Sequence, residues 1–385
     1  MRVVLDPTAF SQPLDLLALL AACARAQHGL AAPIAARDGW LDTLGALAGP
    51  LGALFDALAA RYTLHPATAA TITVRCAGGS NWPTAALEPG DAAALLAQPL
   101  ELLVENERAD FAFLRRIAHP HQRAQLDAAV AAGALRVRQG GGITEVKKSV
   151  EALRPQGSGP GEADRRVRRL RTVVLYDRDA QLTDHRLPGR DATDLDQQLA
   201  DPVANDPWPW WGHRLRRRHI ESYVPVEVLE GWQKGDQDTG ITPHTTQQHQ
   251  AAAAVIVALR SASGAQRSIA HALPMKGGLL SVVSKAQRSA LPQLAPNAGA
   301  QQRMAVENAV AQALNGAWPP PFDQLSPAHR ADLLVGWGRC LQDVFSSAAP
   351  RWDQSFWDEF DRDLDPTDPG DLAALALVDT LLERL

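Results

Sequence analysis

Cysteine, methionine and tyrosine are scarce in this chain of 385 residues, with three of each. The cysteines, Cys23, Cys76 and Cys340, are too far apart for a CxxC zinc pair and too few for an even-numbered disulfide framework. Long apolar runs are missing too, since none reaches the ~18 residues that a membrane-spanning helix needs. The first residues, MRVVLDPTAF, lack the features of a secretory signal peptide. We therefore expect a cytoplasmic protein with no membrane segment.

A strong charge of either sign is also lacking, because the net charge is only −5. The charge is unevenly distributed: residues 98–225 hold 21 Lys or Arg against 18 Asp or Glu, so the rest of the chain is acidic. A locally basic segment of this kind can bind a polyanion such as nucleic acid. The same residues also fit helix faces that only contact water. No GxxxxGK[ST] motif occurs, so any control by ATP must come from another protein.

The two ends of the chain have mostly helical patterns. Residues 1–96 are rich in Ala and Leu, and segments such as PLDLLALLAACARAQ have helical apolar spacing. The short pieces RVVLD and TITVR could form strands. Residues 291–385 carry further apolar stripes at helical spacing. We predict a mainly helical N-terminal domain over 1–96 and a helical C-terminal region over 291–385, each for support or for partner binding.

Strand and helix patterns alternate over residues 97–290. The run LELLVE ends in Glu105, ALRVRQ meets the glycine turn Gly140, Gly141 and Gly142, and TVVLYDRDA ends in Asp177 and Asp179. This alternation predicts an α/β fold with a mainly parallel sheet. Ligands of such sheets bind beyond the carboxyl ends of the strands, so we expect the acids and the glycine turn to meet at one edge. Crowded carboxylates repel each other unless a cation joins them, and hard oxygen ligands suit Mg²⁺ or Mn²⁺.

Five segments within residues 98–290 together resemble a TOPRIM domain, the catalytic unit of topoisomerases, primases and several nucleases. They are LLVENERADF, GGG, VVLYDRDA, RLRRRHIESYVP and LPMKGGLL, in that order. The last two resemble an IENYL-type element and a lysine-bearing motif. Both occur in nucleases of the overcoming-lysogenization-defect type and in nuclease subunits of two-component phage-defence systems. The resemblance implies a TOPRIM-like, mainly parallel sheet flanked by helices over residues 97–290.

The first of these motifs departs from the family pattern. Asn106 stands where the family usually has Gly. Ala109 stands where the family usually has a second acid, and Asp110 comes one position later. The VEN form also resembles TOPRIM proteins related to archaeal topoisomerases and to meiotic double-strand-break enzymes. More than one subfamily therefore stays open.

The resemblance implies a role for each matched residue. Asp177 and Asp179 would be metal ligands, and Glu105 would be a ligand or a general base. Glu221 would complete a second metal shell, and Lys276 would supply positive charge to the transition state. The glycine turn would let the backbone approach a phosphate. Structural alternatives are a charge at a helix N-terminus for Glu105, a solvated turn for the aspartates, an arginine pair for Glu221 and a surface position for Lys276.

Two arginine-rich runs could hold a nucleic-acid backbone, the usual source of non-specific affinity. They contain Arg165 and Arg168 in DRRVRRLR, and Arg216, Arg217 and Arg218 in RLRRRH. The alternative is that these arginines only lie on helix faces that contact water.

We predict a Mg²⁺-dependent endonuclease that cleaves DNA or structured RNA in bacterial anti-phage defence, together with an ABC- or AAA-type ATPase partner. The alternative is a non-catalytic TOPRIM module that binds nucleic acid or a partner. Topoisomerase- or primase-like chemistry is least favoured, because none of Tyr62, Tyr176 and Tyr223 has the context of a free nucleophile. The sequence leaves open the substrate, the trigger and whether the chain forms a homo-oligomer.

Overall fold

The computed structural model describes residues 1–26, 28–64, 71–154, 162–180, 182, 187–200, 211–241, 245–275, 278–291, 299–314, 316–334, 341–364 and 372–385. Within them lie two four-stranded sheets whose strand pairs are all parallel, with helices around both. The predicted α/β fold with a parallel sheet is confirmed. None of the described helices combines the length and the apolar character needed to cross a bilayer.

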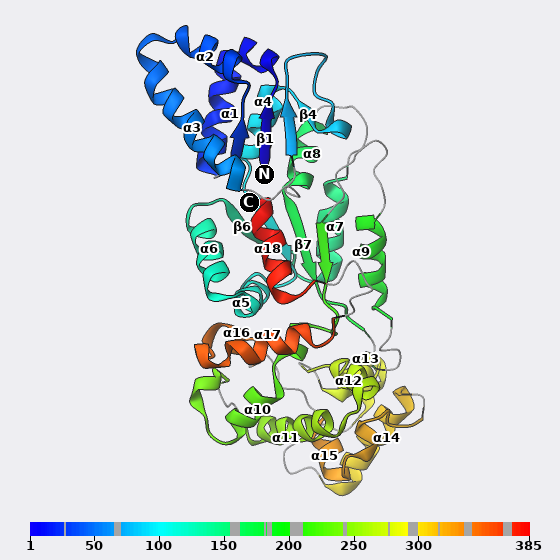
Figure 1. Cartoon of the computed structure of the whole chain (residues 1–385). Coiled ribbons are helices and arrows are strands. Elements are labelled where there is room, and N and C mark those ends of the chain that lie inside the picture. Colours follow the sequence, from blue (N-terminus) through cyan, green and yellow to red (C-terminus); the bar gives the residue numbers. More distant parts are fainter. Residues whose placement is uncertain are drawn as a thin grey trace.

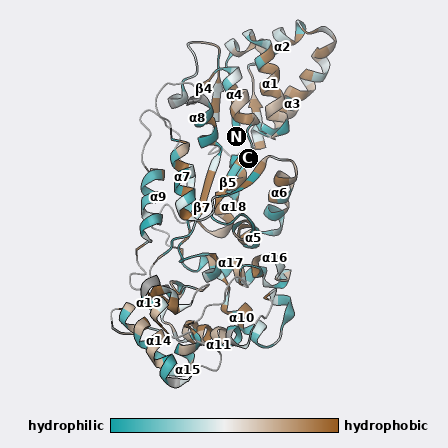
Figure 2. Ribbon diagram, turned by 180° about the vertical axis from the view of Figure 1, so that it is seen from behind, coloured by the Kyte–Doolittle hydropathy of each residue, from teal (hydrophilic) through white to brown (hydrophobic). Residues whose placement is uncertain are grey.

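The central sheet has the strand order β6–β5–β7–β8. Its strands are β5 (Leu100–Val104), β6 (Leu135–Gln139), β7 (Thr172–Tyr176) and β8 (Trp211–Arg214). β7 is buried along its whole length, which explains why its sequence is a continuous apolar run instead of an alternating one. Figure 2 shows this strand as strongly hydrophobic, whereas helix α9 (Arg190–Ala200), further out on the same side, is hydrophilic. Because the strands all run the same way, their carboxyl ends share one edge.

Helices cover both faces of this sheet. On one face lie α5 (Glu107–Ile117) and α6 (Pro120–Ala131), and on the other lie α7 (Ile143–Ala152) and α9 (Arg190–Ala200). Successive side chains of β7 alternate between the two cores, as the two-residue period of a strand requires. The last helix, α18 (Ala374–Arg384), returns to pack against α5 and α6, so the C-terminal residues complete this layer (Figure 1).

A second parallel sheet, in the order β2–β1–β3–β4, lies within the first 96 residues. Its strands are β1 (Arg2–Leu5), β2 (Gly29–Ala31), β3 (Thr71–Val74) and β4 (Ala86–Leu87). Around it lie α1 (Pro13–Arg25), α2 (Ile34–Asp42), α3 (Ala48–Leu64) and α4 (Pro89–Ala97). RVVLD and TITVR do contain strands, but β2 and β4 are too short to leave a periodic pattern. The region predicted as mainly helical is therefore an α/β unit.

A helical lobe lies beyond the carboxyl edge of the central sheet, at the bottom of Figure 1. Its described helices are α10 (Val226–Gln233), α11 (Thr246–Ser261), α12 (Gly264–His271), α13 (Lys285–Ala290), α14 (Ala300–Ala313) and α15 (Pro327–Asp332). Between the lobe and the sheet lie α16 (Val344–Ser347) and α17 (Asp353–Asp361), both packed against α5. One hydrophobic core joins the lobe to the central sheet. It contains residues on both sides of position 290, where the sequence analysis placed the boundary between the TOPRIM-like region and the C-terminal region.

Candidate active site at the carboxyl edge of the central sheet

Glu105 and Asp177 are neighbours at the carboxyl edge of the central sheet. They directly follow β5 and β7, which pair side by side. A Glu105 carboxylate oxygen, Oε1, accepts a hydrogen bond from the backbone N–H of Asp177 at 3.1 Å. Both side chains are half-buried. The structure therefore brings together two acids that lie 72 positions apart in the chain.

Asp179 lies two residues further, on an exposed turn. Its φ is +50°, in the left-handed region that residues other than glycine seldom adopt. Its N–H donates to the carbonyl of Arg218 at 2.9 Å, which ties the turn after β7 to the segment after β8. Burial lowers the pKa of the Arg218 guanidinium, and the negative charges of Asp179 and Asp177 oppose that shift. Both aspartates are therefore close enough to interact electrostatically with Arg218.

Gly189 supports this turn, although the sequence analysis did not single it out. Its N–H donates to the carbonyl of Arg178 at 3.0 Å. A Cβ atom at position 189 would lie only 2.5 Å from the backbone oxygen of Asp179, so no larger residue fits without movement of the backbone. The Pro-Gly pair just before α9 was the available signal, because such pairs mark turns.

The glycine turn connects β6 to α7 and lies against the end of β5. The N–H of Gly140 donates to the carbonyl of Val104 at 2.7 Å, and that of Gly141 donates to the carbonyl of Glu105 at 3.2 Å. Gly141 and Gly142 have φ values of +88° and +107°, which favour glycine strongly. The turn thus meets Glu105 at the edge where the strand pattern predicted it.

Asn106 and Asp110 form the N-terminal cap of α5, which explains the departures from the family motif. The Asn106 side chain accepts a hydrogen bond from the N–H of Ala109 at 3.3 Å. Asp110 Oδ2 in turn accepts from the N–H of Asn106 at 2.8 Å. Reciprocal bonds of this kind satisfy backbone donors at a helix start. Local helix geometry is thus sufficient to account for both residue types.

Glu221 is fully buried in the 3₁₀ turn Ile220–Tyr223. Its partners include Gln342, whose Nε2 donates to Oε1 at 2.8 Å, and His219, whose Nδ1 lies 3.1 Å from Oε2. The residue thus belongs to a buried polar network with Gln342 and His219. Lys276 lies outside the described residues.

The donors at this edge fit a magnesium ion in their chemistry. Among the residues that the structure describes, no three His, Cys, Asp or Glu side chains are grouped closely enough to hold a metal ion. Mg²⁺, however, is commonly bound by one or two carboxylates, with waters and substrate phosphates completing its shell. Glu105 and Asp177 provide such a pair of hard oxygen donors.

The two predicted arginine runs lie at opposite edges of the sheet. Arg165 and Arg168 belong to α8 (Glu162–Leu170), which leads directly into the amino end of β7. Arg216 to Arg218 follow the carboxyl end of β8, beside the acids. The two runs therefore do not form one surface. Arg217 is itself buried and paired with Glu359 and Asp363, so its charge is already compensated.

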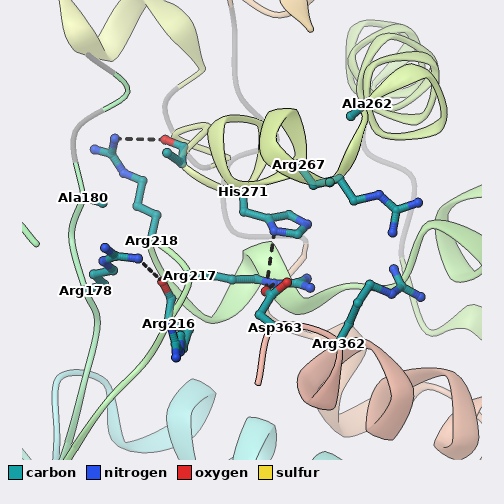
Figure 3. Close-up of a pocket in the computed structure, with 12 residues that line it drawn as sticks. Arg178, Ala180, Arg216, Arg217, Arg218, Ala262, Arg267, His271, Arg362 and Asp363 are labelled. Carbon is teal, nitrogen blue, oxygen red and sulfur yellow. Dashed lines mark hydrogen bonds and ion pairs between the residues drawn. The ribbon is translucent and has the colours of Figure 1, made fainter. Parts of the chain in front are cut away.

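A pocket of about 430 Å³ opens beyond the ends of β7 and β8 (Figure 3). The described residues that line it include His271, a single acid, Asp363, and six arginines: Arg178, Arg216, Arg217, Arg218, Arg267 and Arg362. We call it the arginine pocket. Sequence reasoning missed three of these arginines, because they come from the end of β7, from α12 and from the end of α17, and only folding brings those segments together.

Two arginines of this pocket donate hydrogen bonds to backbone carbonyls. Arg178 donates to the carbonyl of Arg216 at 2.9 Å, and Arg218 donates to that of Ala272 at 3.3 Å. Burial lowers the pKa of Arg178, and the nearby Arg214 and Arg216 lower it further. A bound anion would stabilise the charged form of Arg178 and so oppose the lowering of its pKa.

His271 lies in the wall of the pocket and is buried. Burial, followed by the charges of Arg217, Arg267 and Arg362, lowers its pKa well below the ordinary value of 6.5. Asp363 and Glu359 lie 3.6 and 3.8 Å from its ring nitrogens, but both acids are already paired with Arg217. His271 is therefore neutral in the folded protein at pH 7.

The neutral state of His271 predicts a loss of stability in mild acid. Below about pH 6.5 the unfolded chain binds a proton at this position and the folded chain does not. The free energy of unfolding therefore decreases as the pH is lowered, by up to about 1.4 kcal/mol per pH unit. Urea unfolding midpoints between pH 7.5 and 5 measure this slope. His271→Gln should flatten the profile and His121→Gln, at an exposed position, should not. An equally steep profile in both variants would contradict the prediction.

Two of the three tyrosines are core residues. The hydroxyl of Tyr176 donates to Asp196, and that of Tyr223 accepts from the N–H groups of Arg216 and Arg217. Burial raises the pKa of both phenols. Neither residue has the setting of a nucleophile.

Comparison of the chain with protein-family models, with curated proteins and with solved structures found no match. Its function must therefore be argued from the residues themselves.

Proposed function

We propose that the chain is a divalent-metal-dependent endonuclease that cleaves the phosphodiester backbone of DNA or structured RNA. One observation carries the proposal: Glu105, Asp177 and Asp179 share an edge of the sheet with the arginine pocket. Carboxylates that hold a cation, placed beside guanidinium groups that hold phosphates, are the two components that such a reaction needs. The resemblance to TOPRIM nucleases supports the same chemistry.

Each side chain has a distinct task in this proposal. Asp177 and Glu105 would hold Mg²⁺, and Asp179, predicted as a further ligand, would add negative charge beside the ion from the adjacent turn. The bound ion would activate water and stabilise the leaving oxygen. Arg178 and Arg218 would orient the phosphodiester through charge-assisted hydrogen bonds. Glu105 is also placed to accept a proton from the attacking water as a general base.

The proposal extends to the setting of the reaction. Because the chain has no GxxxxGK[ST] motif, control by ATP would come from an ABC- or AAA-type partner. A role in bacterial anti-phage defence is inferred from the resemblance to TOPRIM nucleases, and a cytoplasmic location from the scarce cysteines.

Strand cleavage tests the proposal directly. The purified chain, alone and with any ABC- or AAA-type ATPase that a neighbouring gene encodes, is incubated with supercoiled plasmid and with folded tRNA. We expect nicking of at least one substrate in Mg²⁺ or Mn²⁺ and none in EDTA. Intact substrates under all of these conditions would overturn the proposal.

A non-catalytic nucleic-acid platform is the second candidate. It is favoured by the bond from the Asp177 N–H to Glu105, which engages one of the carboxylate oxygens expected to bind the metal. This candidate predicts binding of nucleic acid with equal affinity in Mg²⁺ and EDTA, and no cleavage.

Gly189→Ala is expected to lower the cleavage rate by about 10-fold or more. The added methyl group would meet the Asp179 carbonyl at 2.5 Å, so the turn that carries this acid must move. Initial rates of plasmid nicking measure the effect. Gly39→Ala in α2 is the matched control, because a Cβ atom there meets nothing within 4 Å. A normal rate in Gly189→Ala would show that the position of Asp179 does not matter.

A further inference from the structure

The arginine pocket has a size that suits a single nucleotide unit. Its lining comes from the ends of β7 and β8, from α12 and from the end of α17 (Figure 3). Its volume of about 430 Å³ lies within the range of small-molecule sites. One nucleotide unit, and not a continuous backbone, matches that size.

Arginines dominate the lining of the pocket. Six arginines and one acid are among the described residues that line it, and two of the arginines, Arg217 and Arg362, are paired with the Glu359 carboxylate. Arg267 and Arg362 come from opposite walls, and in Figure 3 their guanidinium groups point toward one another. A phosphodiester carries one negative charge, whereas a terminal phosphate monoester carries about −1.5 to −2 at pH 7. Paired guanidinium groups match the geometry of the monoester oxygens.

Burial is the main cause of the depressed pKa of His271 in the pocket wall, and neighbouring positive charges add to it. Three arginines, Arg217, Arg267 and Arg362, act on it in the same direction, and the two neighbouring acids do not reverse their effect. A dianion held between Arg267 and Arg362 would reduce the positive potential that these arginines create.

We propose that the arginine pocket binds the terminal phosphate of a nucleic-acid strand, so that strands with a phosphorylated end are preferred ligands. The inference rests on the proposed function only in taking nucleic acid as the ligand. Arg218 lies beside both the pocket and the aspartates, so a strand anchored here by its end would lie next to the acid edge.

Binding in EDTA tests this inference without cleavage. Fluorescence anisotropy compares single-stranded 12-mers that carry a 5′-phosphate, a 3′-phosphate or hydroxyl groups at both ends. We expect at least one phosphorylated strand to bind about 10-fold tighter than the hydroxyl-ended strand, well beyond the effect of adding about two charges to a strand that already carries about eleven. Equal affinities would overturn the inference. A free nucleoside monophosphate that competes as strongly as the phosphorylated strand would also overturn it, because the pocket would then be a nucleotide site.

Arg267→Gln/Arg362→Gln is the decisive variant. Arg267 is half-buried and Arg362 is exposed, so the fold should tolerate both changes. We expect the preference for the phosphorylated end to fall below about 2-fold, while the hydroxyl-ended strand loses less than about 3-fold. Arg136→Gln, at an exposed position of β6, is the matched control and should keep the full preference. A preference that survives the double substitution would exclude the pocket as its source.

The two proposals can fail separately. Asp177→Asn should retain the end preference, since the anisotropy measurement needs no metal. An end preference without any Mg²⁺-dependent cleavage would support the pocket and refute the nuclease. Cleavage without an end preference would support the nuclease and refute the proposed role of the pocket.

Discussion

Asp177→Asn is expected to lower Mg²⁺-dependent strand cleavage by at least about 100-fold, with little effect on stability. The substitution keeps the size of the side chain and leaves intact the backbone N–H that donates to Glu105. It removes the negative charge that would hold the cation, and the loss of one oxyanion-hole donor, a comparable electrostatic contact, reduces a rate about 10²–10³-fold. Initial rates of plasmid nicking, with circular dichroism as a check of the fold, measure the effect.

Glu105→Gln separates charge from hydrogen bonding at the same edge. The amide oxygen of Gln can still accept from the Asp177 N–H, so the strand ends should stay in place while the charge is lost. We expect a loss of cleavage similar to that of Asp177→Asn.

Asp127→Asn is the matched control for both substitutions. Asp127 lies on α6, is half exposed and pairs with Arg115, away from the edge. Its substitution should change the rate by less than about 2-fold. Normal cleavage by Asp177→Asn would contradict a catalytic role for the acids and would favour the non-catalytic platform.

Arg217→Met is expected to be the most destabilising of the substitutions considered, at about 3–5 kcal/mol. The guanidinium is 1% exposed and is bonded to the Glu359 carboxylate, to Asp363 at 2.6 Å and to the carbonyl of Ser222 at 2.8 Å. Glu359 is 5% exposed, so removal of Arg217 would leave a buried carboxylate with too little compensating charge. The midpoint of urea unfolding, followed by tryptophan fluorescence, measures the loss.

Two further variants identify burial as the cause of this loss. Arg362→Gln removes a second partner of the same Glu359 carboxylate, but Arg362 is 36% exposed and the cost should stay below about 1 kcal/mol. The double variant Arg217→Met/Glu359→Met removes both charges and should be more stable than Arg217→Met alone. If Arg217→Met cost no more than Arg362→Gln, this account of the buried network would be wrong.

The acid edge was predictable because its signals are local. β5 and β7 appear in the sequence as short apolar runs that end in acids, and the glycine turn follows β6 directly. One general rule, that parallel strands share a carboxyl edge, was then enough to place Glu105 beside Asp177. The N-terminal sheet was not predicted, because β2 and β4 hold only three and two residues and are too short to show an alternating apolar pattern.

The arginine pocket was not predictable from the sequence. Its walls come from four segments, and charged side chains on a helix surface follow no pattern that identifies a partner. Arg217 illustrates the limit, since its sequence RLRRRH suggested a nucleic-acid contact and the fold buries it against Glu359. Glu221 is similar, because its contact with Gln342 joins positions 121 residues apart in the chain.

The sequence by itself determined the α/β class, the parallel central sheet and the acids at its edge, because strand period and chain order are properties of neighbouring residues. Only the tertiary structure decided which arginines gather beside those acids and which are neutralised in the core. Burial and long-range charge pairing depend on contacts between segments more than 100 residues apart, as in the Arg217–Glu359 pair, and no local pattern encodes them.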